Sequence, residues 1–210
     1  MTAKEIAERV GRNVIIGIAG ASSSGKTTLA RRLAEALKPG AEVVPEVARY
    51  YHEHHPTSAD GALRQYFFLR EQMDEELGKS ASYPVTLTDS PALTILAHSF
   101  RAGHSAEEAE VLSSIVKRAW QVIPSYWLTL LVETEDIRLD GVRDRGGVAN
   151  SRAVYSMLRG LSDTMNDGDR GAGGAGIVYL GRGTIDERLA LALAAIQTRL
   201  DATPGSGVVV

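Results

Sequence analysis

The chain of 210 residues contains no cysteine. Disulfides, thiolate zinc sites, iron–sulfur clusters and a cysteine nucleophile are therefore excluded. Long apolar runs are also missing, since the longest span about eight residues and are too short to cross a bilayer. The first residues, Met1 to Glu5, include an acidic side chain and lead into no apolar segment, unlike a secretory signal. We therefore expect a cytoplasmic protein without membrane contact.

A surplus of positive charge is absent as well. The chain has 23 Lys and Arg against 26 Asp and Glu, for a net charge of −3. This balance argues against a generally basic coat for nucleic acid, although a local basic cleft remains compatible with it. A composition of 44% hydrophobic and 23% charged residues is ordinary for a globular protein. We expect one domain over residues 1–210, and the composition leaves the oligomeric state open.

Short β-rich runs alternate along the chain with longer helical patterns, which is typical of an α/β fold with a parallel sheet. Ser105 with Glu108, and Thr184 with Glu187, have the spacing of capping boxes at helix starts. Strands are predicted at 13–19, 42–44, 85–88, 127–132 and 177–180, and helices at 26–37, 60–77, 91–100, 151–165 and after each capping box.

The remaining segments are predicted to be loops or a tail. Residues 51–56 are expected to form a polar, histidine-rich loop, and the helix at 60–77 is expected to bury a face built mostly from apolar side chains. That face comprises Leu63, Tyr66, Phe67, Arg70, Met73 and Leu77. A lid loop is expected at about 134–150, a mobile glycine-rich loop at about 168–176 and a tail at about 202–210.

The strongest motif is a complete G-x-x-x-x-G-K-[ST] phosphate loop between the first predicted strand and helix. Its glycines allow backbone conformations that a side chain would forbid. Its N–H groups can then surround a phosphate at the positive end of the following helix. The lysine adds a charge, and the threonine hydroxyl can ligate Mg²⁺. The predicted ATP-binding residues are Gly20, Ala21, Ser22, Ser23, Ser24, Gly25, Lys26, Thr27 and Thr28. The dinucleotide fingerprint G-x-G-x-x-G is absent from this turn, which argues against a nicotinamide-dependent dehydrogenase.

Two carboxylates follow predicted strands, at the edge of a parallel sheet where ligands bind. Asp89 ends the third strand, and we assign it with Thr27 to Mg²⁺. Glu46 follows the second strand and is the candidate general base or ligand of an acceptor hydroxyl. The alternative for each is a surface carboxylate that caps a neighbouring helix.

A charged, glycine-flanked segment precedes the helix predicted at 151–165. It contains Asp140, Arg143 and Arg145. Two arginines in such a segment suit a lid that closes on a transferring phosphate and excludes water. The alternative is a solvated polar loop.

The order of these motifs resembles the P-loop kinases of the nicotinamide riboside kinase type, as in the kinase domain of the bifunctional bacterial NAD-biosynthesis regulator. The resemblance covers about residues 14–200. It rests on the phosphate loop, on Pro45-Glu46-Val47-Ala48-Arg49-Tyr50, on Thr88-Asp89-Ser90 with Thr94, on Leu130 to Glu133, and on Asp140-Gly141-Val142-Arg143.

The resemblance implies a P-loop fold of the nucleoside or nucleotide kinase type, with a five-stranded parallel sheet flanked by helices and a lid loop. It also implies ATP- and Mg²⁺-dependent phosphoryl transfer to a hydroxyl of a nucleoside-like acceptor. Lys26, Glu46, Asp89 and Arg143 would be catalytic, Arg145 and Arg182 would lie near ATP, and Glu46, Arg49 and Asp140 would lie near the acceptor. Tyr50 follows a predicted strand and is expected to face the cleft, where it could stack on an acceptor base.

The sequence departs from that family at the acceptor side. Arg49 is followed by Tyr50-Tyr51 rather than Glu-Tyr, and the aromatic residue that the family carries shortly before Asp-Gly is missing. Two alternatives therefore stay open. One is a kinase acting on a modified base such as 5-hydroxymethyluracil in DNA, and the other is a regulatory NTPase switch. The cluster His52-Glu53-His54-His55 could hold a metal, but a solvated segment is the more common form of such a cluster.

Overall fold

The computed structural model describes residues 1–55, 61–101, 105–133, 147–168 and 176–203. These residues contain one parallel sheet of five strands in the order β2-β3-β1-β4-β5. The strands are β1 (Val14–Gly20), β2 (Ala41–Val44), β3 (Val85–Asp89), β4 (Leu128–Val132) and β5 (Ile177–Leu180). The predicted sheet is confirmed, and each strand end lies within one residue of its predicted position.

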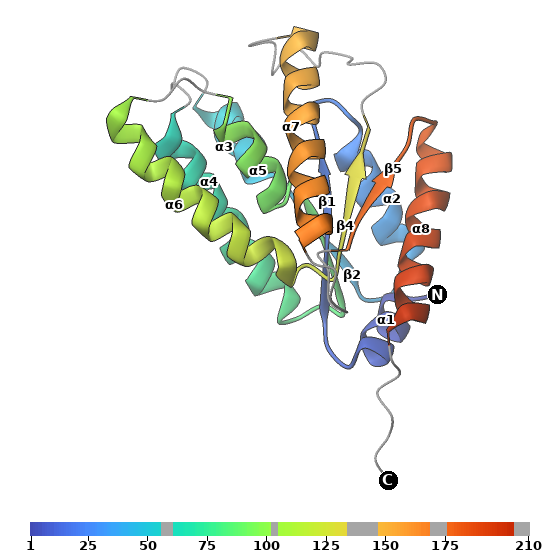
Figure 1. The fold of residues 1–210 in the computed structure, drawn as a ribbon. Coiled ribbons are helices and arrows are strands. Elements are labelled where there is room, and N and C mark those ends of the chain that lie inside the picture. Colours follow the sequence, from blue (N-terminus) through green and yellow to red (C-terminus); the bar gives the residue numbers. More distant parts are fainter. Residues whose placement is uncertain (56–60, 102–104, 134–146, 169–175, 204–210) are drawn as a thin grey trace.

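Helices cover both faces of the sheet (Figure 1). On one face lie α1 (Ala3–Val10), α2 (Lys26–Ala36) and α8 (Ile185–Ala202). On the other lie α3 (Val47–His54), α4 (Ala62–Ser80), α5 (Ala92–Ser99), α6 (Ala106–Val122) and α7 (Gly147–Gly168), with a 3₁₀ turn, η1 (Ile123–Ser125), before β4. None of the described helices combines the length and the apolar character needed to span a membrane.

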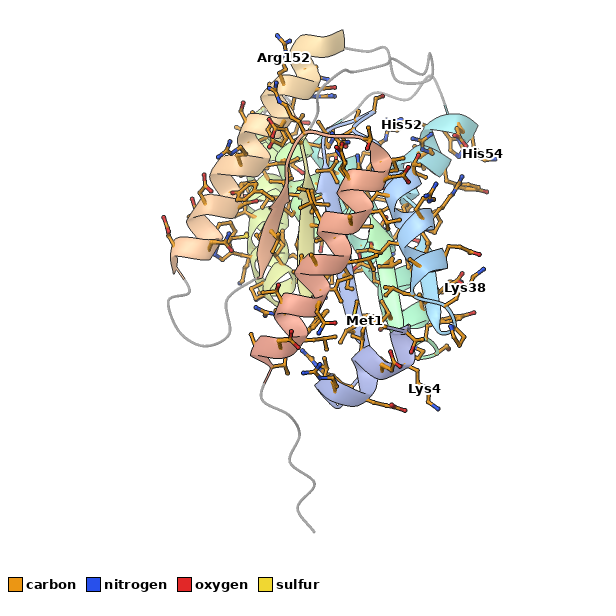
Figure 2. The ribbon with its side chains drawn as sticks, turned by 90° about the vertical axis from the view of Figure 1, so that its right-hand side faces the viewer. Met1, Lys4, Lys38, His52, His54 and Arg152 are labelled. Atoms are coloured by element: carbon orange, nitrogen blue, oxygen red, sulfur yellow. The ribbon has the colours of Figure 1, made fainter. Side chains whose placement is uncertain are left out.

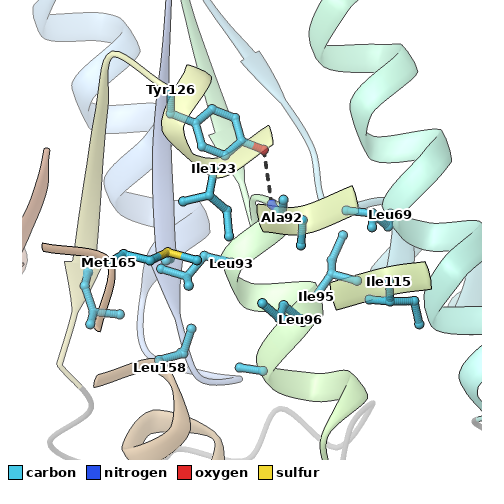
Figure 3. Close-up of a cluster of buried hydrophobic side chains, with 14 of the residues drawn as sticks. Leu69, Ala92, Leu93, Ile95, Leu96, Ile115, Ile123, Tyr126, Leu158 and Met165 are labelled. Carbon is cyan, nitrogen blue, oxygen red and sulfur yellow. Dashed lines mark hydrogen bonds between the residues drawn. The ribbon is translucent and has the colours of Figure 1, made fainter. Parts of the chain in front are cut away.

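Two apolar cores lie between these layers, and alternate residues of β1 supply both. Ile16 and Ile18 face α2 and α8, whereas Ala19 faces α5 and α7. The α5 side also holds Leu93, Leu96 and the buried Tyr126, which Figure 3 shows among their neighbours. Every residue of β3 and β4 is buried, as expected for strands that are covered on both faces.

Local sequence explains where several helices begin. The two predicted capping boxes are confirmed at the starts of α6 and α8. A third box, Thr2 with Glu5, starts α1, which the sequence analysis did not predict. That helix ends at Gly11, whose φ of +76° lies in the left-handed region that favours glycine.

The predicted loop at 51–56 is wrong over residues 51–54, which belong to helix α3. Rings four residues apart stack along this helix: the Tyr50 and His54 centroids lie 4.1 Å apart, and those of Tyr51 and His55 lie 4.6 Å apart. Such pairs stabilise a helix by roughly 0.2–0.5 kcal/mol each. His54 and His55, which suggested a polar loop, therefore each pair with the ring of a tyrosine four residues earlier.

The predicted buried face of α4 is also wrong. Leu63 and Leu77 are 71% and 60% exposed, and Tyr66 and Phe67 are about two-fifths exposed. Of the predicted face only Met73 is buried. The face that packs on the sheet includes Phe68, Leu69, Gln72 and Glu76. Because two polar residues lie on it, hydrophobic spacing alone selected the wrong side of the helix.

Three predicted boundaries need correction. Residues 147–150 of the predicted lid loop form the first turn of α7, and Gly168 of the predicted glycine-rich loop ends that helix. Ala202 of the predicted tail is the last residue of α8. Residues 134–146, 169–175 and 204–210 of these segments lie outside the described residues.

Candidate active site

The register of the parallel sheet brings the carboxyl ends of its strands to one edge. Ile18 pairs with Asp89, and Gly20 pairs with Val132. Val44 likewise pairs with Thr88 in the neighbouring strand. The residues that follow β1, β2 and β3 therefore meet at this edge, where open α/β sheets bind ligands. They are the phosphate loop, Glu46 and the segment that begins at Asp89.

The phosphate loop has the backbone that its sequence predicts. Gly25 has a φ of +89°, and Ser23 has a φ of +59°. Left-handed residues within a turn direct successive N–H groups inward and form an anion-binding nest. At Gly20 a Cβ atom would lie 2.7 Å from Ser24 Oγ and 3.0 Å from the Val132 carbonyl oxygen, so a side chain would not fit. Lys26 is buried, and its Nζ donates a hydrogen bond of 2.8 Å to the Ala21 carbonyl.

Thr27 and Asp89 lie in contact at the start of α2. The Thr27 hydroxyl donates to Asp89 Oδ2 at 2.5 Å, although 62 residues separate the two in sequence. Asp89 is 1% exposed. A hydroxyl and a carboxylate are oxygen ligands of the kind that Mg²⁺ prefers, so the donor set fits this ion. Sequence reasoning therefore selected two residues that the fold brings together.

Ser90, which follows Asp89, has a φ of +66°, unusual for a residue with a side chain. The next residue, Pro91, packs over Gly17 of β1, where a Cβ atom would lie 3.1 Å from Pro91 Cγ. The chain therefore turns sharply from β3 into α5 beside β1. Such strained residues cluster at functional sites.

Glu46 lies at the end of β2 and immediately precedes α3. Its side chain makes no capping hydrogen bond to that helix, so the helix-capping alternative is not realised here. Arg49 lies one turn further and is half-buried, whereas Tyr50 is 67% exposed and stacks on His54. Thr28 is exposed on α2. Asp140, Arg143 and Arg145 lie outside the described residues.

Sequence reasoning missed Arg188, a buried residue of α8. Its Nη1 donates to the Ser24 carbonyl at 2.9 Å, and its Nη2 donates to the Glu133 carbonyl at 2.8 Å. The guanidinium thus joins the phosphate loop to the residue that follows β4. Arg182, after β5, is 69% exposed and pairs with the Glu133 carboxylate at 3.2 Å. The capping box at Thr184 places Arg188 in the first turns of α8, but no motif marked its role.

A second missed feature is a buried carboxyl group behind β3. Glu76 is 2% exposed and accepts hydrogen bonds from the Thr88 hydroxyl at 2.7 Å and the Tyr126 hydroxyl at 2.9 Å. Burial raises the pKa of Glu76 to about 7, and the two hydroxyl donors oppose this rise. Burial and the neighbouring Glu76 raise the pKa of Tyr126 well above its usual value.

The histidine cluster does not gather into a metal site. Figure 2 shows His52 and His54 at the end of the molecule that carries Arg152, opposite Met1 and Lys4. Within the part of the chain that the structure describes, no group of three or more histidine, aspartate or glutamate side chains could hold a metal ion. The histidine rings instead pack on tyrosine and phenylalanine rings of α3 and α4.

Comparison with known families agrees with this geometry. The family model described as "AAA domain" (AAA_28) matches residues 15–166, which is more than half of the chain. The chain belongs to this family. The match spans the phosphate loop, both acidic strand ends and the segment with the predicted lid arginines. No curated protein matches the sequence at a significant level.

Solved structures resemble the chain in fold. A structure of NadR protein in complex with NR has a TM-score of 0.70 at 18% identity, over 96% of this chain and 55% of that one. NadR in complex with NAD and AMP-PNP has a TM-score of 0.65 at 18% identity, over 92% and 51%. Thymidylate kinase from Candida albicans has a TM-score of 0.63 at 17% identity, over 91% and 94%. The chain thus spans about half the length of the NadR structures. The predicted P-loop fold of the nucleoside or nucleotide kinase type is confirmed.

Proposed function

We propose that the protein is an ATP- and Mg²⁺-dependent kinase that transfers the γ-phosphoryl group to a hydroxyl of a nucleoside-like acceptor. The observation that carries the proposal is the contact between the Thr27 hydroxyl and the Asp89 carboxylate beside the buried Lys26. Membership of the AAA_28 family and the likeness of fold to NadR and to thymidylate kinase support the proposal.

Each residue has a defined part in the proposed reaction. The loop amides and Lys26 bind the phosphates of ATP. Thr27 and Asp89 would hold Mg²⁺, which supplies charge neutralisation at the phosphate oxygens when bound. Phosphoryl transfer needs positioning and charge stabilisation more than covalent participation by the protein. Charged and polar groups converge on one edge of the sheet, which is the arrangement that such a reaction requires.

Glu46 is the proposed partner of the acceptor. The acceptor oxygen forms a bond to the γ-phosphorus, while the bond between that phosphorus and the bridging oxygen of ADP breaks. The proton of the hydroxyl passes to the Glu46 carboxylate. Arg143 is proposed to close over the transferring group, with Asp140 near the acceptor and Arg145 near ATP. Arg49 and Tyr50 are proposed to contact the acceptor from α3, and Arg182 to lie near the nucleotide.

The proposal is tested by ADP release from Mg²⁺-ATP across a panel of acceptors, with mass detection of the product. The panel holds nicotinamide riboside, the common nucleosides, thymidine monophosphate, plain DNA, hydroxymethyluracil-containing DNA and a water blank. Stimulation by a nucleoside supports the proposal. Stimulation by thymidine monophosphate alone would make the acceptor a phosphate, and stimulation by modified DNA alone would make it a base in DNA. A flat panel would favour a nucleotide switch. Asp89→Asn serves as the inactive control, because contaminating kinases would not respond to it.

A further inference from the structure

The side chain of Gln72 holds the backbone on both sides of Glu46. The Val47 N–H donates to Gln72 Oε1 at 3.0 Å, and Gln72 Nε2 donates to the Pro45 carbonyl at 3.4 Å. The same Nε2 donates to Thr88 Oγ1 at 3.0 Å. An amide nitrogen carries two hydrogens, so both donations are available at once. Gln72 is 1% exposed, so water does not replace these partners.

The hydrogen bonds continue from Thr88 to the other acidic turn. The Thr88 hydroxyl donates to Glu76, and the Tyr126 hydroxyl donates to the same carboxylate. The Tyr126 oxygen in turn accepts the Ala92 N–H at 3.1 Å, the bond drawn in Figure 3. Ala92 is the first residue of α5, three residues after Asp89. One buried series of hydrogen bonds therefore connects the turn that carries Glu46 with the turn that follows Asp89.

The donor and acceptor roles in this series of hydrogen bonds are mutually compatible. Each hydroxyl, of Thr88 and of Tyr126, accepts one N–H and donates its own hydrogen to Glu76. The carboxylate is the common acceptor of both arms. A buried polar network with every member satisfied is rigid, because any shift leaves a donor or acceptor unpaired at low dielectric. The two turns are therefore held at a fixed separation by side chains rather than by the sheet alone.

We propose that Gln72 is a positioning residue for the acceptor: its amide, anchored through Thr88 and Glu76, holds Glu46 at a fixed place relative to Asp89. The proposal rests on the proposed role of Glu46 as ligand or base of the acceptor hydroxyl. An error of about 1 Å in such a geometry can cost about a hundred-fold in rate. A leucine of similar size would fill the space of Gln72 but hold neither Pro45 nor Val47.

The first experiment compares Gln72→Leu with the wild type and with Gln121→Leu, a matched change on the exposed end of α6. With the acceptor that the panel identifies, we expect Gln72→Leu to lower kcat by ten- to a hundred-fold. We expect KM for ATP to change by less than about two-fold, because the phosphate loop is untouched. Gln121→Leu should change neither. An equal loss in ATP binding would overturn the proposal, since it would mean general damage to the fold.

A double-variant cycle separates positioning from packing. In a Glu46→Gln background the group that Gln72 positions is already disabled, so adding Gln72→Leu should cost less than about two-fold further. Two full, multiplicative losses would show that Gln72 acts independently of Glu46 and would overturn the proposal. Normal turnover in Glu46→Gln alone would instead contradict the proposed function.

Hydrogen exchange gives a readout that needs no turnover. Gln72→Leu should raise exchange in a peptide covering residues 45–50, because the Val47 N–H loses its acceptor. A peptide covering residues 19–27 should keep its wild-type exchange. Unchanged exchange at 45–50 would overturn the positioning role even if no acceptor in the panel were active. The two failures are therefore distinguishable.

Discussion

The proposed nucleotide half and the proposed acceptor half of the candidate site are built differently. The nucleotide half consists mainly of residues 20–28, which are contiguous in sequence and act through backbone amides and a few side chains. In the proposed acceptor half, Gln72 of α4 bonds to the backbone on both sides of Glu46 and to Thr88 of β3. The first half depends on local conformation, and the second on a buried network that joins distant elements. We expect the two halves to respond differently to substitution.

The largest effect is expected in the nucleotide half, for Lys26→Ala. This change removes the ammonium from the phosphate loop, and we expect turnover to fall by about a thousand-fold. The unfolding transition in urea should persist, because the hydrogen bond from Lys26 to the Ala21 carbonyl lies within the phosphate loop and joins no two elements of the core. Lys38→Ala is the control: Lys38 is exposed and pairs with Glu35, so turnover should be unchanged. Turnover retained in Lys26→Ala would exclude the phosphate loop from the reaction.

Arg188→Met is expected to have the next largest effect. The Ser24 and Glu133 carbonyls would each lose a buried donor, at about 1–3 kcal/mol apiece. We expect nucleotide affinity, measured with a fluorescent ATP analogue, to fall about ten-fold, and Arg188→Lys to recover part of it by reaching one carbonyl. Arg32→Met removes an exposed ion pair between α2 and α8 and should cost less than about 1 kcal/mol. Wild-type affinity in Arg188→Met would mean that the loop holds its shape without this support.

The same contrast explains which parts of the molecule the sequence predicted. The phosphate loop with Thr27 was selected because its residue types at that spacing are typical of phosphate binding, and Asp89 was selected because it ends a predicted strand of a parallel sheet. Gln72 and Glu76 were missed because a polar residue on a helix is ordinarily placed in solvent. Only the positions of Thr88 and Tyr126 in the fold show that Glu76 has buried partners. Helix α3 was missed for a related reason. The polar, histidine-rich composition of that segment is typical of a loop, and the ring pairs that stabilise the helix are visible only in the structure.

Glu76→Gln tests the buried network through the pH dependence of stability. The pKa of Glu76 is about 7 in the folded protein against 4.5 for the ordinary group. Between these values the unfolded chain releases its proton while the folded protein keeps it, so the stability due to this group falls as pH rises. The loss is complete above pH 7 and amounts to about 3 kcal/mol. The difference in unfolding free energy between Glu76→Gln and wild type should therefore grow by about that amount from pH 4.5 to 8.

Urea unfolding of both proteins at several pH values provides this measurement, and taking the difference cancels the titration of the other carboxyl groups. Glu75→Gln is the matched control, because Glu75 is the exposed neighbour of Glu76 on α4. Its difference from wild type should stay within about 0.5 kcal/mol across the range. A flat difference for Glu76→Gln would mean that Glu76 ionises normally in the folded protein, and the network would then carry a buried negative charge at neutral pH.

The smallest effect is expected for Tyr50→Ala, which tests how far the acceptor half extends toward solvent. Tyr50 is 67% exposed, and its ring stacks on His54. Losing one such pair should lower the free energy of unfolding by less than about 0.5 kcal/mol. Because the ring is largely exposed, we expect contact with an acceptor to be partial and KM for the acceptor to rise about three-fold. Tyr50→Phe keeps the ring and should keep KM. An unchanged KM in Tyr50→Ala would confine the acceptor half to the turn held by Gln72, and would leave Tyr50 as one member of the ring pairs that stabilise α3.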